Sequence, residues 1–354
     1  MILPDILTHE AIELLKALIA IPSFSKEEDR TAELLHQWLS DRKIPIERIG
    51  NNIIARNKYF TPEKKSLLLN SHHDTVKPNK NYTREPFTPI IEDGKLFGLG
   101  SNDAGGCLVS LMASFLHFYE AQDLPFNIIF IASAEEEISG KNGIELALTL
   151  VDNIEAAIVG EPTQMQMAVA ERGLMVVDCE AKGVAGHAAR KEGDNALYKA
   201  IKDIQWIQSC SFNKVSELLG ESTMSVTVIE TDNKQHNVVP ASCKFVIDVR
   251  CNELYSFEEI VSELKNNLSS EVTPRSMRLR STSISIQHPL VQSGISLGRT
   301  YYGSPTTSDK ALMPFPALKM GPGDSARSHT ADEFIYVDEI KEGIALYVEL
   351  IKRL

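Results

Sequence analysis

Short apolar runs alternate along this chain with longer segments in which apolar residues recur every three or four positions. The runs Ser66–Asn70, Phe126–Ala132 and Ala156–Val159 are rich in leucine and β-branched residues, which is typical of strands buried on both faces of a sheet. Segments with helical spacing lie between them, at about residues 8–21, 25–43, 107–122 and 143–150. This alternation predicts an α/β domain with a mixed, mostly parallel sheet flanked by helices.

Two polar residues mark the expected starts of the first helices. Thr8 is the predicted N-cap of the first helix, and Ser25 with Glu28 forms a predicted capping box for the second.

The order of elements changes after Arg172. The patterns predict strands at about 174–181, 223–229, 241–250 and 281–287, with helices at about 195–209, capped by Asp194, and 257–268, opened by a second capping box at Ser256 and Glu259. Strand–helix–strand–strand–helix–strand is the order of the split βαβ, or ferredoxin-like, α+β unit. The sequence therefore predicts a discontinuous domain of residues 1–172 and 285–354, with a second domain inserted at 173–284.

Composition narrows the class of protein. The 354 residues are long enough for two domains, and a net charge of −12 argues against nucleic acid or an anionic membrane as a partner. The five cysteines contain no CxxC pair, which indicates a reducing compartment. The first residues lack a secretory signal pattern, and no apolar run is long enough to span a membrane. A cytoplasmic protein is expected.

The chemistry is expected where the predicted strands end. In open α/β sheets, functional side chains lie just beyond the carboxyl ends of the strands. Two histidines and several carboxylates occupy such positions or nearby loops, without a thiolate: His72, Asp74, Asp103, Glu135–Glu137, Glu161 and His329. This donor set suits two divalent ions, zinc foremost, with one carboxylate between them. Asp74, two residues after His72, can accept the imidazole N–H and orient the ring.

In order and spacing, eight motifs resemble those of one known family. They are HHD at 72–74, GLGSND at 98–103, EEE at 135–137, GEPT at 160–163, GHAAR at 186–190, NVVP at 237–240, DVR at 248–250 and SHTADE at 328–333. The chain resembles, over essentially its whole length, the co-catalytic zinc peptidases and deacylases that include acetylornithine deacetylase, succinyl-diaminopimelate desuccinylase, aminoacylase and glutamate carboxypeptidase. The inserted domain would then be a lid and dimerisation domain.

The resemblance implies a role for each metal-type residue. Asp103 would bridge two ions, zinc or its substitutes cobalt and manganese. His72 and Glu161 would complete one ion, and Glu137 and His329 the other. Glu136 would be the general base, with Asp74 supporting His72.

The resemblance also implies residues that bind substrate. His187 would cross a dimer interface and stabilise the tetrahedral oxyanion in the partner's active site. Asn237 and Arg250 would face the same cleft, where the Arg250 fork suits an α-carboxylate. Backbone N–H groups of the turn Gly321 to Gly323 could bind that carboxylate as well.

Some positions depart from the family pattern, which leaves the subgroup and substrate open. Ala104, Gly105 and Gly106 follow Asp103 where a lysine is common, Ser71 replaces a glycine, and Glu135 replaces an aspartate. The short chain is most similar to acetylornithine deacetylases of arginine biosynthesis. The predicted enzyme is a homodimer that removes a small acyl group from an amino acid, N-acetylornithine first and N-acetyl- or N-succinylcitrulline second.

Two alternatives remain. One is a desuccinylase, dipeptidase or aminoacylase of the same family. The other is a non-catalytic, metal-stabilised binding dimer, which would be expected to lack a ligand or the base, although all are present here.

Overall fold

The computed structural model describes residues 4–190 and 192–354, which divide into two compact units. The first unit contains the described residues up to Val169, together with Ile284–Tyr302 and Ser308–Leu354. The second contains Ala170–Ser283 and Gly303–Thr307. The short segment 303–307 thus groups with the second unit, whereas the sequence placed it in the first domain. The catalytic role of one domain and the lid and dimerisation role of the other stay predictions.

The first unit is built on a mixed sheet. Its central strands β6, β3, β7 and β17 run parallel to one another, while β2, β1 and β8 join the sheet in antiparallel fashion. The strands, in sheet order, are β1 (Ile46–Ile49), β2 (Asn52–Arg56), β6 (Asn127–Ser133), β3 (Ser66–His72), β7 (Ile154–Val159), β17 (Ala317–Lys319) and β8 (Met167–Glu171). The strands β15 (Thr282–Ser283) and β16 (Tyr301–Ser304) also pair with β8.

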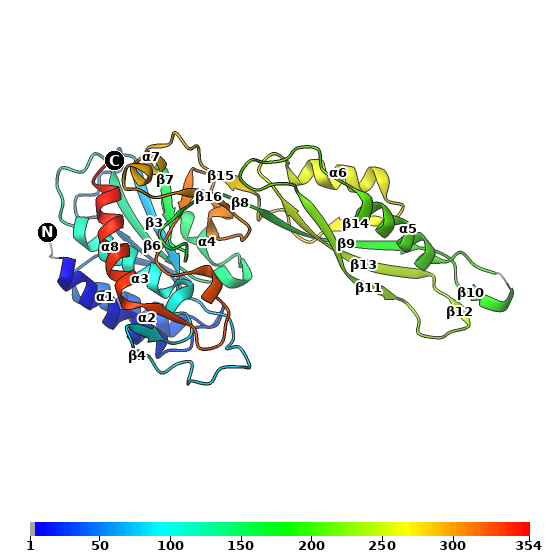
Figure 1. Cartoon of the computed structure of the whole chain (residues 1–354), viewed down its shortest axis with the longest axis horizontal. Coiled ribbons are helices and arrows are strands. Elements are labelled where there is room, and N and C mark those ends of the chain that lie inside the picture. Colours follow the sequence, from blue (N-terminus) through cyan, green and yellow to red (C-terminus); the bar gives the residue numbers. More distant parts are fainter. Residues whose placement is uncertain (1–3, 191) are drawn as a thin grey trace. The chain divides into compact units, whose positions relative to one another are not determined.

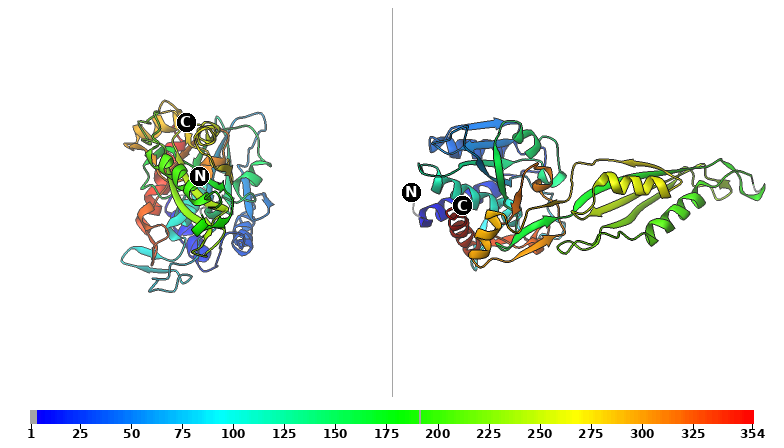
Figure 2. Two further views of the ribbon diagram at one scale, coloured as in Figure 1. Left: turned by 90° about the vertical axis from the view of Figure 1, so that its right-hand side faces the viewer. Right: turned by 90° about the horizontal axis from the view of Figure 1, so that it is seen from above.

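Helices cover both faces of this sheet, which explains why β3 and β6 are buried along their whole length. On one face α3 (Gly106–Phe118) packs on β3 and β6 and lies against α1 (Pro4–Ile19) and α8 (Val337–Ile351), as Figures 1 and 2 show. On this face the ring of Phe130 lies 5.9 Å from that of Phe115. The neighbouring residues Ile129 and Ile131 point to the opposite face and pack against α4 (Ile144–Leu148).

The remaining elements of the first unit lie around this core. The helix α2 (Asp29–Asp41) packs on β1 and β2, and α7 (Pro289–Ser296) packs on α8. A small antiparallel sheet is formed by β4 (Ile90–Glu92), β5 (Lys95–Phe97) and β18 (Phe334–Tyr336). No helix in the described part of the chain is long and apolar enough to cross a lipid bilayer.

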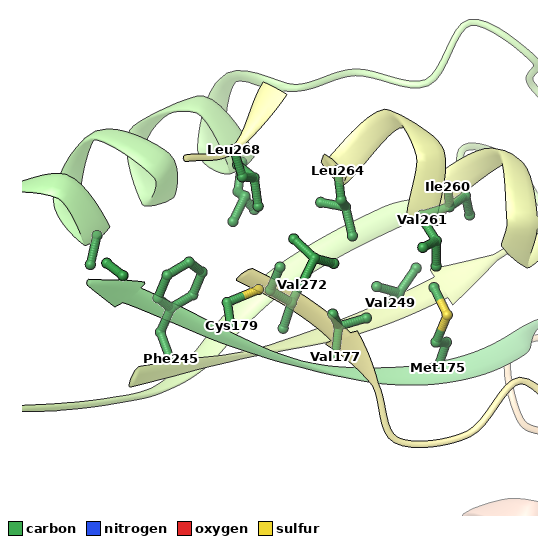
Figure 3. Close-up of a cluster of buried hydrophobic side chains, with 14 of the residues drawn as sticks. Met175, Val177, Cys179, Phe245, Val249, Ile260, Val261, Leu264, Leu268 and Val272 are labelled. Atoms are coloured by element: carbon green, nitrogen blue, oxygen red, sulfur yellow. The ribbon is translucent and has the colours of Figure 1, made fainter. Parts of the chain in front are cut away.

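The second unit confirms the predicted ferredoxin-like order. Its elements are β9 (Gly173–Lys182), α5 (Ala196–Ser209), β11 (Thr223–Thr231), β13 (Ser242–Cys251), α6 (Phe257–Asn267) and β14 (Glu271–Pro274). The strands form an antiparallel sheet in the order β11-β13-β9-β14. Figure 3 shows residues of β9 and β13 pointing at Ile260, Val261 and Leu264 of α6. Alternate residues of β9 and β13 are buried, so one face of this sheet holds the core and the other does not.

Several predicted boundaries differ from the structure. The helix α1 extends before Thr8, which is therefore no N-cap, and α5 is capped by Asn195, whose side chain accepts two backbone N–H groups, rather than by Asp194. The predicted strand 281–287 is only β15, and the fourth strand of the second unit is β14. That strand was missed because it is short and ends at Pro274. The capping box of Ser256 and Glu259 is confirmed.

Candidate active site

The parallel strands bring three of the predicted groups to one edge of the sheet. In the register of β3, His72 lies opposite Ser133 of β6, and Asn70 lies opposite Val159 of β7. His72 ends β3, the acids Glu135–Glu137 follow β6 directly, and Glu161 follows β7. Residues far apart in sequence therefore share this edge because their strands are parallel.

Two further residues arrive from loops. Asp103 lies in the turn Ser101–Gly105 that leads into α3, and its own backbone angles, φ −118° and ψ 97°, are not helical. The carboxyl group of Glu333 accepts the backbone N–H groups of Gly100, Asn102 and Asp103 at 3.1, 2.8 and 2.9 Å, which holds this turn in place. His329 follows β17 and has a positive φ of 60°, so its loop turns sharply at this residue.

The two oxygens of Asp103 face two different histidines. Its Oδ1 is 3.4 Å from His72 Nε2, and its Oδ2 is 3.7 Å from His329 Nε2. Glu161 Oε1 lies 3.8 Å from His72 Nε2, while Glu137 Oε2 lies 3.0 Å from His329 Nε2. The five side chains therefore form two neighbouring groups that share Asp103, which is the arrangement that a bridging carboxylate requires.

The imidazole of His72 is oriented for ligation. Its Nδ1 faces the backbone oxygen of Asp74 at 3.0 Å and the side-chain Oδ1 of the same residue at 3.4 Å, so Nδ1 carries the hydrogen. The other nitrogen, Nε2, is buried, has no hydrogen-bond partner among the described residues, and faces carboxylates. A buried acceptor of this kind needs a partner, and a divalent cation supplies one. The O and N donor set fits zinc in particular.

Burial and close contacts between carboxylates and imidazoles shift several pKa values in this cluster. Burial lowers the pKa of His72, but the carboxylates of Asp103 and Asp74 and the charge of Glu136 outweigh burial and raise it well above its ordinary value. Burial raises the pKa of Asp103, but His72 more than offsets that effect, so the pKa is lowered. The carboxylate of Glu137 raises the pKa of His329 to about 9. The carboxylates of this cluster outnumber its two imidazoles, so added cations would offset the remaining negative charge.

Glu136 has a different environment from an ordinary surface acid. Burial raises its pKa well above the usual value, and the charges of Glu161, Asp309 and Glu137 add to that increase despite the opposing effect of His72. Its Oε2 lies 4.0 Å from His72 Nε2, next to the groups described above. A carboxylate with a raised pKa can accept and return a proton near neutral pH.

Asp74 does more than orient His72. Its Oδ1 accepts the backbone N–H of Glu136 at 3.0 Å, and its Oδ2 accepts that of Glu137 at 3.2 Å. Asp74 thus holds both the end of β3 and the turn formed by Glu135–Glu137 after β6, here called the acid turn.

Three predicted substrate-binding residues lie in the second unit. The pair β10 (Gly186–His187) and β12 (Val238–Val239) brings His187 close to Asn237, because the Ala188 N–H donates to the Asn237 carbonyl at 3.0 Å. Arg250 lies near the other end of β13, eight residues beyond Ser242, or about 26 Å at about 3.3 Å per residue. A strand therefore separates Arg250 from His187 and Asn237 within one chain, and the predicted roles of these three residues stay predictions. The Arg250 guanidinium donates to Asp248 at 2.8 and 3.1 Å.

The turn at Gly321 and Gly323 lies in the first unit beside the Glu161 loop. The Gly321 N–H donates to the Thr163 hydroxyl at 3.0 Å, and the predicted contact of this turn with a substrate carboxylate stays a prediction. A side chain at Gly321 would meet the Glu161 carbonyl oxygen at 2.6 Å, so this position needs glycine for close packing on the loop that carries Glu161. Gly323 has a φ of +91° and borders Asn102.

Four residues support the cluster without having been predicted to do so: Ser25, Glu28, Asp309 and Glu333. The first two were interpreted as a capping box, but α2 begins at Asp29 without a side-chain cap hydrogen bond. Asp309 accepts a hydrogen bond from Ser133 at 2.6 Å, and burial raises its pKa to about 6. Glu333 is the last residue of the motif SHTADE at 328–333, which is the sequence feature that could have identified it.

Known proteins resemble this chain in sequence and in fold. The model of Peptidase family M20/M25/M40 matches residues 68–353. Succinyl-diaminopimelate desuccinylase 2 of Ruegeria sp. (strain TM1040) is 26% identical over 267 residues, which cover 71% of this chain and 68% of the relative. The succinyl-diaminopimelate desuccinylase of Wolbachia pipientis subsp. Culex pipiens (strain wPip) is 25% identical over an alignment of 372 residues. That alignment covers 97% of this chain and 93% of the relative.

Solved structures share the fold over nearly the whole chain. Aminopeptidase PepT from Bacillus cereus ATCC 10987 is similar with a TM-score of 0.77 and 19% identity, covering 99% of both chains. The Bacillus subtilis YXEP protein, described as a dinuclear metal binding peptidase from the M20 family, has a TM-score of 0.75 and 15% identity, covering 98% of both chains. At these identities the likeness shows the fold.

Proposed function

This chain belongs to peptidase family M20/M25/M40 and is a hydrolase of amide bonds; on that premise we propose that it removes the acyl group of an N-acyl amino acid with two divalent metal ions, zinc foremost. The observation that carries the proposal is the position of Asp103 between His72 and His329, with one oxygen directed at each imidazole. A structural ion pair would need only one such contact.

The geometry supports the following proposed roles. His72 and Glu161 would hold one ion, Glu137 and His329 would hold the other, and Asp103 would serve both. When bound, the two ions lower the pKa of a water molecule and polarise the amide carbonyl. The Glu136 carboxylate takes the proton of that water and returns it to the nitrogen of the leaving amine. Asp74 keeps the backbone of Glu136 in place through its N–H.

We expect Asp309→Asn to move the acidic limb of the pH profile. Activity requires Glu136 without its proton, so kcat/KM falls as the pH drops through the pKa of Glu136. The charge of Asp309 raises that pKa, and its removal should therefore shift the limb to lower pH. The measurement is kcat/KM between about pH 4.5 and 8, a range that spans the expected limb. Asp152→Asn is the control, since Asp152 is exposed before β7, at the opposite end of that strand from Glu161; a limb that stays in place or moves upward would contradict the proposed coupling.

The acyl group and amino acid are the finer part of the proposal. The relatives at 25% and 26% identity are called succinyl-diaminopimelate desuccinylases, which favours an N-succinyl amino acid with a second amino group. N-acetylornithine, which the sequence motifs predicted first, is the second candidate.

A substrate panel tests this proposal. The purified, zinc-loaded chain is assayed for free amine release from N-succinyl- and N-acetyl-diaminopimelate, -ornithine and -citrulline, and from simple dipeptides. We expect N-succinyl-diaminopimelate to have the highest kcat/KM. A preference for N-acetylornithine would support the second candidate, and hydrolysis of dipeptides alone would overturn the acyl amino acid proposal.

We further propose that the protein is a homodimer in which His187 of the partner subunit stabilises the oxyanion. In this chain His187 is exposed, and its Nδ1 accepts the Ala189 N–H at 3.2 Å. Its Nε2 therefore carries the hydrogen and can donate it to an oxyanion.

Mixed dimers test the role of His187. His187→Ala and Glu136→Gln should each be nearly inactive alone, since an oxyanion donor and a general base each contribute about 100-fold or more. Co-refolded mixtures should regain about a quarter of wild-type activity, because half of the dimers are hybrids and each hybrid has one intact site. Unmixed variants combined without exchange are the control, and no regain in the exchanged mixture would overturn the role in trans.

A further inference from the structure

We propose that Glu28 is a positioning residue for the general base, an inference that rests on the proposed function. Glu28 is fully buried at the start of α2, far before the acid turn in sequence. Its hydrogen bonds do not reach the two groups of proposed metal ligands, and its effect would pass through the backbone of Glu135 to Glu136.

The Glu28 carboxyl group is the acceptor in each of its side-chain hydrogen bonds. Its Oε1 accepts the Lys26 N–H at 2.7 Å and the Glu135 N–H at 3.1 Å, and its Oε2 accepts the Asn51 side-chain amide at 2.9 Å. Buried carboxylates with such partners form strong, charge-assisted hydrogen bonds. The first of these bonds orders the loop before α2, and the second connects that loop to the turn after β6.

Glu28 and Asp74 divide three consecutive amides between them. Glu28 accepts the N–H of Glu135, and Asp74 accepts those of Glu136 and Glu137. Asp74 is in turn held by the Ser25 hydroxyl, which donates to its Oδ2 at 2.7 Å. The segment from Ser25 to Glu28 therefore supplies one of the two carboxylates that fix the acid turn, Glu28, and holds the other, Asp74, through Ser25.

The acid turn needs such support because its conformation is unusual. Glu135 has a positive φ of 54°, in the left-handed region that side-chain-bearing residues rarely adopt. Such residues persist where their surroundings over-determine them, and they cluster at functional sites. The turn places the side chain of Glu136, the proposed base, near His72, and that of Glu137, a proposed metal ligand, near His329. Loss of the Glu28 contact would let the backbone at Glu135 relax and would misplace Glu136.

Small displacements of a general base have large kinetic effects, since proton transfer requires hydrogen-bond distance. We expect Glu28→Gln to lower kcat about tenfold or more, with KM within about twofold of wild type and both ions retained in each chain. The glutamine keeps the size of the side chain but replaces one acceptor oxygen with an NH₂ group, which cannot accept from both Glu135 and Asn51. Amide hydrogen exchange, followed on a peptide covering residues 134–138, should be faster in this variant.

Thr31→Val is the matched control. Thr31 is buried in the same cluster, and its hydroxyl donates to the backbone carbonyl of Glu28 at 2.9 Å and lies 2.9 Å from Nδ1 of His73. Within the described part of the chain its hydroxyl forms no hydrogen bond with the Glu28 carboxylate or with the acid turn, so the variant tests the loss of a neighbouring contact. This variant should lose about as much stability as Glu28→Gln, yet keep kcat and the exchange rate of residues 134–138.

The double variant Glu28→Gln with Glu136→Gln should lose little more kcat than Glu136→Gln alone, because both changes act on the same base.

The outcomes separate the two proposals. If Glu28→Gln and Thr31→Val lower kcat equally, or if exchange at 134–138 is unchanged in Glu28→Gln, the positioning role is refuted. If the wild-type chain hydrolyses nothing in the substrate panel, the proposed function fails, and the exchange measurement alone still decides whether Glu28 holds the acid turn.

Discussion

Glu136→Gln should reduce kcat by about 100- to 10,000-fold while the protein keeps both metal ions. Glutamine has nearly the same shape but cannot take a proton, and general acid–base catalysis contributes about this factor. The buried position of Glu136 beside His72, and the increase that burial causes in its pKa, are the properties expected of a base that cycles one proton. The measurements are steady-state kcat on the best substrate of the panel and metal content per chain by mass spectrometry.

Glu63→Gln provides the control for this change. Glu63 is exposed in the loop before β3, at the opposite end of that strand from His72, so its replacement should leave kcat and metal content unchanged. If Glu136→Gln loses an ion together with activity, Glu136 is a ligand and one of the five proposed ligands must take the part of the base.

Removal of the metal ions should abolish activity and destabilise the first unit. Without cations, Asp103, Glu137 and Glu161 remain close together with charges that only His72 and His329 oppose among the described residues of the cluster. Each ion, at a hundredfold excess over its Kd, should add about 2.7 kcal/mol to the free energy of unfolding. The measurements are activity and thermal unfolding after chelation, and again after addition of Zn²⁺, Co²⁺ or Mn²⁺.

His72→Ala distinguishes this effect from a general action of the chelator. The variant lacks the imidazole that faces Asp103 and Glu161, so the chelator should change its thermal unfolding less than that of the wild type. A wild-type chain that keeps its activity and unfolding temperature after chelation, with no metal detected, would overturn the two-metal site.

Local sequence patterns are sufficient to predict strands that are buried on both faces. Strands such as β3 and β6 could be predicted because burial on both faces makes them continuously apolar, and that property is visible in the sequence itself. The short strand β14 could not, because Val272 alone in it is buried and Pro274 ends it. The pair Ser25 and Glu28 has the spacing of a capping box, but tertiary partners far along the chain compete for both side chains.

The sequence by itself determined the order of the elements, the two-unit pattern and the residue types at the strand ends, because hydrophobic periodicity and motif spacing are properties of the chain. Only the tertiary structure decided that Asp103 directs one oxygen at each of two histidines, that Glu28 holds the acid turn, and that Arg250 lies far along β13 from His187. These relations depend on strand register and on contacts between residues far apart in sequence, which no local pattern specifies.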